Sequence, residues 1–304
     1  MAARGKATQR AAFVRSDRTW VRRALSAIFD FIRSQPIGSL SAALLVLVGM
    51  IAVWAPYIAP YPPFETHPDA RLLGPTSAHW LGTDFFGRDT LSRVIFGARV
   101  SFQVGILATL VTVAVSTSLG VTGAYFGSVW DYILGRVVDL VQAIPFLVLL
   151  LPLTIIFGRS LVSLSIVLGL LIGIIASRVI RGATLTVMGQ QYIEVAQAVG
   201  CSHPRILMRH VVPNVFPLVI VIASINIGAV IIAEASLSFL GYGVDTTKSV
   251  SWGAMLSADG RRYMITQPWL FVAPAAALGV VIFSMNMLGD ALRDRLDPRL
   301  RRGR

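Results

Sequence analysis

Six long apolar segments divide the chain, and polar or proline-rich stretches lie between them. The segments span roughly residues 37–59, 101–127, 133–158, 161–181, 215–236 and 268–289. Each has enough residues to cross about 30 Å of hydrocarbon as a helix that rises about 1.5 Å per residue. The first is too long for the core of a signal peptide, so we expect an uncleaved helix there. The pattern predicts an all-α polytopic membrane protein with six transmembrane helices.

Charged residues are scarce, which supports this class. They make up 14% of the 304 residues, and hydrophobic residues make up 55%, whereas a soluble domain carries about 25% charged residues. The single cysteine, Cys201, excludes intrachain disulfides and a cysteine-based zinc site. A net charge of +12 is compatible with nucleic-acid binding, but in a membrane protein a basic excess reports orientation. We therefore expect a lipid membrane, and no nucleic acid, as a partner.

The positions of the basic residues predict the side of the membrane that each loop faces. With six spans and an inner N-terminus, 19 of the 27 Lys and Arg residues fall in cytoplasmic segments. Cytoplasmic loops carry the excess of basic residues in membrane proteins. Both termini are therefore expected in the cytoplasm, and an odd number of spans is disfavoured because it would place one basic tail outside.

These observations predict four regions. Residues 1–36 form a basic cytoplasmic tail, and residues 37–100 contain the first transmembrane helix and an external loop. Residues 101–289 form a core of five helices with a cytoplasmic loop at 184–214, and residues 290–304 form a second basic tail. Within the external region, apolar residues fall at helical spacing over residues 88–98, which predicts an amphipathic helix lying at the outer membrane interface.

The cytoplasmic loop 184–214 contains Tyr192–Asn214, the most polar long interval in the C-terminal half. We expect one helix from Thr184 to Val199 that ends at Gly200 in the left-handed conformation. Ser202 is a good N-cap for a second short helix with Pro204 in its first turn, and Pro213 is expected to end that helix. The small residues at the bend would let another backbone approach: Ala196, Ala198 and Gly200. The alternative is an amphipathic loop that lies on the membrane surface.

Polar residues inside the predicted spans are candidates for lining a transport pathway, because lipid offers them no partner. They are Asp139, Gln142, Asn226, Glu234, Ser284 and Asn286. Hydrogen bonding between helices is the alternative for each, and for Asp139 a structural pair with Arg136 competes with a gating role.

Glycine and proline spacing predicts how the helices pack and bend. Gly123 and Gly127, and likewise Gly169 and Gly173, are four residues apart, which predicts close helix approach. Two prolines inside the third span predict kinks, at Pro145 and Pro152.

Catalytic motifs are missing from the sequence. The closest approach to a phosphate-binding loop is Lys248-Ser249, but Tyr242 and Thr247 occupy the positions that would need glycine. The four histidines lack the HExxH spacing, and no GxSxG sequence occurs. We expect no catalytic residue, no metal site and no cofactor in this chain.

Four stretches resemble the permease subunits of importer-type ABC transporters. In the cytoplasmic loop 184–214, called the coupling loop from here on, Glu194, Ala196 and Gly200 resemble the EAA pattern of these permeases, with Val195 in place of the first alanine. The other three stretches resemble the dipeptide, oligopeptide and nickel permeases. They are Leu81–Phe102, the pair Ser236–Gly243 and Ser251–Leu256, and Asn286–Arg301. The resemblance runs from about residue 37 to residue 301 and is to the dipeptide-permease C type.

The resemblance implies a MetI-like permease core preceded by one extra N-terminal helix, in the bacterial inner membrane. It implies a non-catalytic subunit that pairs with a homologous second permease, two ABC ATPase subunits that bind ATP and Mg, and an extracytoplasmic substrate-binding protein. The expected substrates are di- and oligopeptides, with nickel, haem or glutathione as the alternative. A self-sufficient channel or secondary transporter is the alternative from another class. The residues implied in ATPase coupling are Tyr192, Glu194, Ala196, Ala198, Gly200, Ser202, His210 and Pro213.

Overall fold

The computed structural model describes residues 29–296, and this part of the chain is built from helices without a β-strand. The five long helices are α2 (Pro36–Ile58), α3 (Thr90–Phe126), α6 (Leu161–Met188), α9 (Val212–Phe239) and α11 (Trp269–Leu296). The shorter ones are η1 (Pro68–Ala70), α4 (Ser128–Ala143), α5 (Phe146–Phe157), α7 (Gln191–Ala198), α8 (His203–Ile206), η2 (Leu207–Val211), α10 (Trp252–Met255) and η3 (Leu256–Gly260). Most of the two predicted basic tails lies outside the described residues.

The spans agree with the predicted number, but the third is broken. Five helices in the described range are long and apolar enough to cross a membrane, and α4 with α5 makes a sixth span if the pair is counted as one. The predicted helix 133–158 is wrong as a single rod, because α4 and α5 meet at an angle of 99°. Ile144 between them is extended, as expected for a residue before proline. The kink expected at Pro145 is therefore a complete break, whereas Pro152 stays inside α5.

The separate interfacial helix predicted over residues 88–98 is wrong. This segment is the beginning of α3, which continues for 37 residues to Phe126, a length of about 55 Å. The carboxylate of Asp89 caps the helix by accepting a hydrogen bond from the backbone N–H of Ser92 at 2.8 Å. The buried Trp252 then covers the segment, since its indole N–H donates to the carbonyl of Val94 at 2.8 Å. Packing against α10 covers part of this apolar stripe.

The single helix predicted from Thr184 to Val199 is wrong, because residues 184–188 are the end of α6 and α7 begins only at Gln191 after a turn at Gly189. The helix in the second half of the coupling loop also differs from its prediction. Pro213 does not end it, because α8, η2 and α9 form one helix from His203 to Phe239. The π-helical turn η2 lies just before Pro213. A π-helical turn shifts the hydrogen-bond partners by one residue, so that a helix can accommodate a proline without stopping.

The most extensive helix contact joins α3 and α6. A Cβ atom at Gly169 would lie 2.6 Å from the carbonyl oxygen of Ala108, and one at Gly173 would lie 2.8 Å from Cβ of Val115. The close approach predicted for these two glycines is therefore confirmed. The other predicted pair behaves differently, because a Cβ atom at Gly127 would meet nothing within 4 Å. Gly127 instead has φ +61° and forms the turn between α3 and α4.

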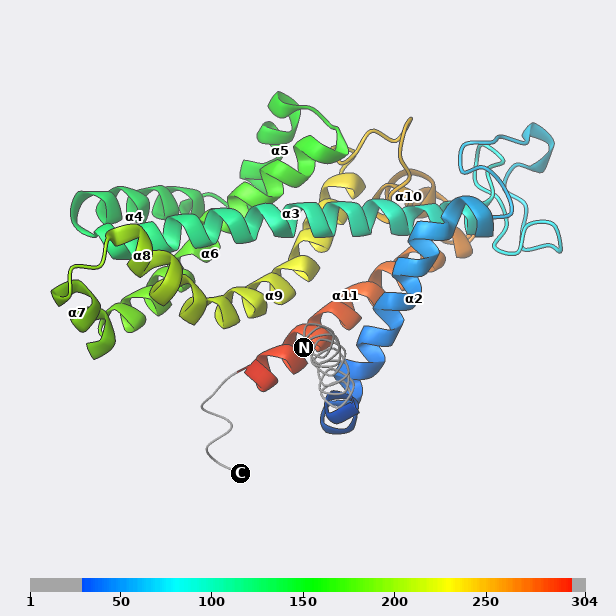
Figure 1. The fold of residues 1–304 in the computed structure, drawn as a ribbon. Coiled ribbons are helices and arrows are strands. Elements are labelled where there is room, and N and C mark those ends of the chain that lie inside the picture. Colours follow the sequence, from blue (N-terminus) through cyan, green and yellow to red (C-terminus); the bar gives the residue numbers. More distant parts are fainter. Residues whose placement is uncertain (1–28, 297–304) are drawn as a thin grey trace, which may run out of the picture.

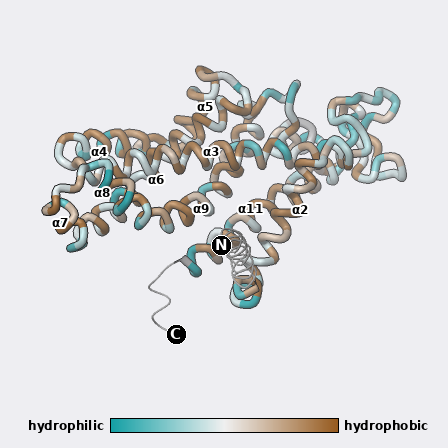
Figure 2. Tube along the Cα trace, in the orientation of Figure 1, coloured by the Kyte–Doolittle hydropathy of each residue, from teal (hydrophilic) through white to brown (hydrophobic). Residues whose placement is uncertain are grey.

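The contacts between distant segments support the predicted orientation. At the predicted outer side, the guanidinium Nε of Arg159 donates to the carbonyl of Gly243 at 3.0 Å. At the predicted cytoplasmic side, Arg181 of α6 pairs with Asp131 of α4. Figure 1 shows α4, α7 and α8 at one end of α3 and the external segment 59–89 at the other. Figure 2 shows that the external segment is mostly hydrophilic and that the long helices are mostly hydrophobic.

Candidate functional site

The coupling loop forms a compact projection that is anchored by a few buried side chains. Ile193 of α7 and Ile206 of α8 are each 1% exposed. They pack in one apolar cluster with Ile180 of α6 and Val215 of α9. The cluster fixes the loop to the cytoplasmic ends of α6 and α9.

The bend between α7 and α8 has the predicted left-handed glycine. Gly200 has φ +82°, and the N–H of Cys201 donates to the carbonyl of Ala196 at 3.0 Å. This six-to-one bond around a left-handed residue is the Schellman arrangement that ends a helix. A Cβ atom at Gly200 would meet nothing within 4 Å. The bend is therefore open to a second protein, although a non-glycine residue would strain the backbone.

The outward face of the coupling loop carries an apolar patch. Val195 and Val199 lie one turn apart and are 61% and 78% exposed. Met208, in η2, is a further exposed apolar residue of the loop at 73%. Val199 and Met208 were not singled out by the sequence reasoning. The spacing of four residues between Val195 and Val199 in a polar segment could have indicated Val199, because exposed apolar residues grouped on one face mark interaction surfaces.

The predicted coupling residues are either exposed or half-buried. Tyr192, Glu194, Ala198, Gly200 and Ser202 are exposed, and the Ser202 side chain forms no capping hydrogen bond although Ser202 is at the N-cap position. Ala196 and His210 are half-buried. The ring centroids of Tyr192 and His210 lie 6.3 Å apart. This contact joins α7 to the helix that leads into the membrane. Pro213 is exposed within that helix.

Sequence reasoning missed a contact that joins the coupling loop to α3. The hydroxyl of Tyr125, in the last turn of α3, lies 2.7 Å from Nδ1 of His203, the first residue of α8. The two residues are 78 positions apart in the sequence, and neither belongs to the predicted site. No local signal pairs them, because their contact depends on how α3 packs beside the coupling loop.

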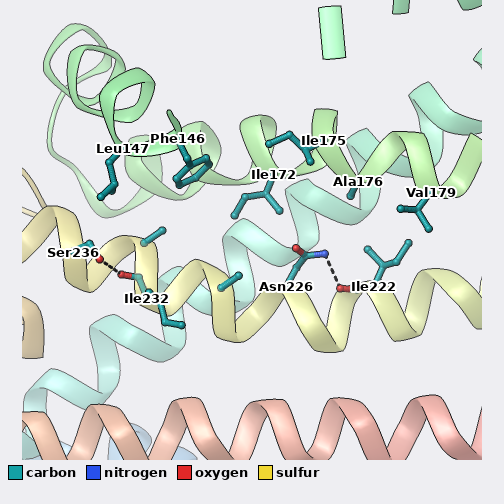
Figure 3. Close-up of a pocket in the computed structure, with 12 residues that line it drawn as sticks. Phe146, Leu147, Ile172, Ile175, Ala176, Val179, Ile222, Asn226, Ile232 and Ser236 are labelled. Atoms are coloured by element: carbon teal, nitrogen blue, oxygen red, sulfur yellow. Dashed lines mark hydrogen bonds between the residues drawn. The ribbon is translucent and has the colours of Figure 1, made fainter. Parts of the chain in front are cut away.

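A cavity of about 550 Å³ lies between α5, α6 and α9. Figure 3 shows its apolar walls, to which Phe146 of α5, Ile172 of α6 and Ile232 of α9 contribute. Asn226 and Ser236 are the two polar side chains in the lining, and no charged residue lines the cavity. The amide nitrogen of Asn226 donates to the carbonyl of Ile222 at 2.8 Å. Its amide oxygen forms no hydrogen bond with any described residue and can accept one from a ligand.

Of the six candidate pathway residues, only Asn226 lines this cavity. Asp139 pairs with Arg136 at 3.4 Å, as expected, and also with Arg178 at 2.5 Å. Arg178 donates to Gln142 at 3.1 Å as well. These bonds tie α4 to α6 near the cytoplasmic side. The pathway role of Asp139 and Gln142 stays a prediction.

The remaining candidates lie nearer the outer side and along α11. Glu234 is fully buried, and one of its carboxylate oxygens accepts a hydrogen bond from Ser238 at 2.6 Å. Ser284 is buried, and its hydroxyl has no hydrogen-bond partner among the described residues. Asn286 is exposed and lies beside Gly228 of α9. Their pathway roles likewise stay predictions.

Comparison with known proteins assigns the family. Residues 114–302 match the family described as "Binding-protein-dependent transport system inner membrane component". Residues 28–75 match the "N-terminal TM domain of oligopeptide transport permease C". The second match covers α2, the extra N-terminal helix that the sequence predicted.

Three curated relatives extend the likeness over most of the chain. The dipeptide transport system permease protein DppC of Alkalihalophilus pseudofirmus is 35% identical, over 83% of this chain and 82% of its own length. The glutathione transport system permease protein GsiD of Pectobacterium atrosepticum is 35% identical, over 93% and 99%. The oligopeptide transport system permease protein OppC of Haemophilus influenzae is 34% identical, over 85% and 84%.

The family match covers more than half of the chain, and its helices agree with a protein that crosses the membrane several times. The fold combines the MetI-like core with the additional N-terminal helix. The chain belongs to the inner-membrane components of binding-protein-dependent transport systems, and it is a multi-pass permease subunit of the bacterial inner membrane of the dipeptide and oligopeptide permease C type.

Proposed function

We propose that this chain forms half of the translocation pathway of an ATP-driven importer of di- and oligopeptides. In this proposal it transmits movement from separate ATPase subunits through the coupling loop. The observation that carries the proposal is the unbroken helix from His203 to Phe239. The same helix begins in the coupling loop and lines the cavity with Asn226.

This continuity gives a mechanical route from the loop to the pathway. A partner that grips the exposed face of α7 and moves it would pull on His203 and its helix. The cavity wall formed by α9 would then shift against α5 and α6, because packed helices move as rigid bodies. Two states of the bundle are thereby linked to two states of the partner, which is the requirement for coupling.

The partners in this proposal supply what the chain does not. Two ATPase subunits bind ATP and Mg, an extracytoplasmic protein delivers the substrate, and a second permease supplies the other half of the pathway. The cavity between α5, α6 and α9 is partly open in the single chain. The second permease would close it. Residues on the exposed face of α5, including Val148 and Ile155, are suited to that contact because they are apolar.

The chemistry of the cavity favours peptides over the alternative substrates. An apolar lining with a single free amide oxygen accepts varied side chains and offers one hydrogen bond to a peptide N–H. Glutathione carries two carboxylates at neutral pH, and no Lys or Arg lines the cavity to receive them. Nickel and haem iron favour imidazole, thiolate or thioether ligands, and the lining contains no His, Cys or Met. Glutathione remains the second candidate because a relative over nearly the whole chain is a glutathione permease.

A self-sufficient channel or secondary transporter is a weaker explanation. A secondary transporter needs a coupling-ion site that opens to the pathway, and Glu234, the single carboxylate of α9, is fully buried. That class would also leave the apolar face of the coupling loop, with Val195 and Val199, without a partner.

The test is purification of the tagged protein from its native membrane in mild detergent, with every co-purifying subunit identified by mass spectrometry. We expect two ATPase chains and a second permease, and ATP-dependent uptake of peptides when the matching binding protein is added. Transport by the chain alone, without an ATPase, would overturn the proposal. Uptake of glutathione but not of peptides would retain the importer and change its substrate.

A further inference from the structure

A second cavity lies on the opposite part of the fold, between α2 and α3. It has a volume of about 570 Å³. Apolar side chains from both helices form most of its surface, and they include Met50, Val53, Phe102 and Ile106. Since α2 and α3 are both candidate membrane spans, this groove lies at membrane depth. It shares no residue with the cavity between α5, α6 and α9.

Two polar side chains of α3 project into this apolar groove. Arg99 and Gln103 both line it, and they lie four residues apart and therefore on one face of the helix. Neither forms a hydrogen bond or an ion pair with any residue that the structure describes. An arginine within a membrane span is costly unless an anion or water receives it. The groove thus contains a positive charge that the described chain does not neutralise.

The polar and apolar ends of the groove are ordered along the membrane normal. A Cβ atom at Gly49 of α2 would contact Phe102 of α3 at 3.5 Å, and the N–H of Tyr61 donates to Ser92 at 3.0 Å. The two helices are therefore antiparallel, with the later part of α2 beside the earlier part of α3. Arg99 lies about 4.5 Å outward of Phe102 at 1.5 Å per residue.

Trp54, which also lines the groove, lies toward the same outer end as Arg99. Trp54 is five residues after Gly49, about 7.5 Å further toward the outer end of α2. Tryptophan is enriched at the level of the lipid headgroups. Val46 and Ile106 lie on the inward side of the contact between Gly49 and Phe102. The groove therefore has a cationic outer end and an apolar inner end.

We propose that this groove binds one anionic glycerophospholipid of the outer leaflet of the inner membrane. Its phosphate pairs with the guanidinium of Arg99 and accepts a hydrogen bond from the amide of Gln103. An acyl chain lies along Met50, Val46 and Ile106 toward the inner end. The lipid neutralises the charge, fills the space and joins the extra N-terminal helix α2 to the core helix α3.

Two other arrangements would use the same arginine. The side chain can extend to water at the interface, because long basic side chains reach several ångströms from their backbone. An acidic residue of a second permease can also pair with it. Neither arrangement calls for the combination of a cationic end with an apolar groove that a phospholipid matches in both its parts.

The experiment uses the importer purified with its partner subunits and reconstituted in nanodiscs. The discs contain phosphatidylcholine and a phosphatidylglycerol that carries a photoreactive group in its acyl chain. After illumination, the labelled peptides are identified by mass spectrometry. We expect labelling of residues 46–53 and 102–106, and we expect unlabelled phosphatidylglycerol to compete better than phosphatidylcholine.

Matched variants separate the charge from the shape of the groove. Arg99→Gln should lower labelling about fivefold, the effect of removing one basic residue near a lipid surface, and Arg99→Lys should retain most of it. Gly49→Leu should lower labelling with the charge intact, because it fills the groove. Arg71→Gln, in the external loop outside the groove, is the control and should change nothing.

Three outcomes would overturn the proposal. Equal labelling of the wild type and Arg99→Gln would mean that the arginine faces water. Equal competition by phosphatidylcholine would mean that the groove has no preference for an anionic lipid. Lipid labelling of the second permease without labelling of residues 46–53 and 102–106 would mean that a protein fills the groove. None of these outcomes tests coupling to the ATPases. The lipid-binding inference is therefore independent of the proposed function.

Discussion

The hydroxyl of Tyr125 lies 2.7 Å from Nδ1 of His203. This contact joins the last turn of α3 to the first residue of the helix that continues to Phe239. Its importance follows from the position of His203 between the coupling loop and the cavity. The contact thus connects α3 to the N-terminal end of the helix that, in the proposed function, carries movement from the coupling loop to the cavity.

Removing this hydrogen bond should loosen the coupling loop. We expect Tyr125→Phe to leave the protein in the membrane and to raise hydrogen–deuterium exchange over residues 191–206 about 2- to 12-fold. This range corresponds to the 0.5–1.5 kcal/mol that a typical hydrogen bond contributes, or about 2- to 12-fold in an opening equilibrium. Tyr132→Phe in α4 is the matched control, because the hydroxyl of Tyr132 has no hydrogen bond with a described residue. Equal exchange in Tyr125→Phe and the wild type would show that apolar packing alone fixes the loop.

A bulky residue at the bend should block docking. We expect Gly200→Trp to reach the membrane but to recover less ATPase in pull-down experiments and to lose ATP-dependent transport. The left-handed backbone adds a strain of about 1–2 kcal/mol to any such change. Gly200→Ala therefore serves as the control for strain, and it should retain most of the ATPase. Normal recovery of ATPase with Gly200→Trp would contradict docking at this bend.

The apolar patch on the coupling loop should contribute to the same contact. We expect Val199→Asp to weaken ATPase binding strongly without affecting folding, because Val199 is 78% exposed in the single chain. Burial of a charge in an apolar interface costs several kcal/mol unless it is paired. Thr186→Asp, at an exposed position near the cytoplasmic end of α6, is the control. Equal ATPase recovery for Val199→Asp and Thr186→Asp would remove Val199 from the interface.

The two candidate residues of α9 should respond differently. Asn226→Ala should change peptide uptake with unchanged assembly, because the side chain lines the cavity and its oxygen is free to accept a hydrogen bond. Glu234→Ala should instead lower thermal stability, because it empties a fully buried site and removes the partner of Ser238. The expected loss is about 2–5 kcal/mol by analogy with other large-to-small changes in cores. Uptake assays and thermal unfolding in detergent measure the two effects. Unchanged uptake with Asn226→Ala would place this residue among the structural ones.

The ion pairs between α4 and α6 should hold the broken third span in place. We expect Arg178→Gln to lower stability by about 0.2–1 kcal/mol, the range for partly exposed pairs. A double-mutant cycle with Asp139→Asn should show that the two effects are not additive, since the guanidinium and the carboxylate are 2.5 Å apart. High salt should reduce the coupling energy. Additive effects in the cycle would show that the pair contributes no stability of its own.

The sequence by itself determined the features that depend on local chemistry. The apolar segments are long enough to span a bilayer, and their surface has to be covered by lipid or protein wherever the chain lies. Gly200 adopts its left-handed conformation because a residue without Cβ can do so at little cost. Pro145 disturbs the third span because it has no N–H and restricts Ile144 before it, although the sequence predicted a kink there and not the complete break. The pairing of Asp139 with Arg136 follows from their spacing on one helix.

Only the tertiary structure decided where helices continue and which polar residues meet. The segment from residue 90 joins α3 because Trp252, far away in the sequence, packs on it. The helix from His203 to Phe239 passes Pro213 through a π-helical turn, which sequence spacing does not indicate. Asn226 reaches a cavity whereas Glu234 is enclosed, although both lie on α9. These outcomes depend on which neighbouring helix covers each face. That choice minimises the free energy of the whole bundle, and no short stretch of sequence contains it.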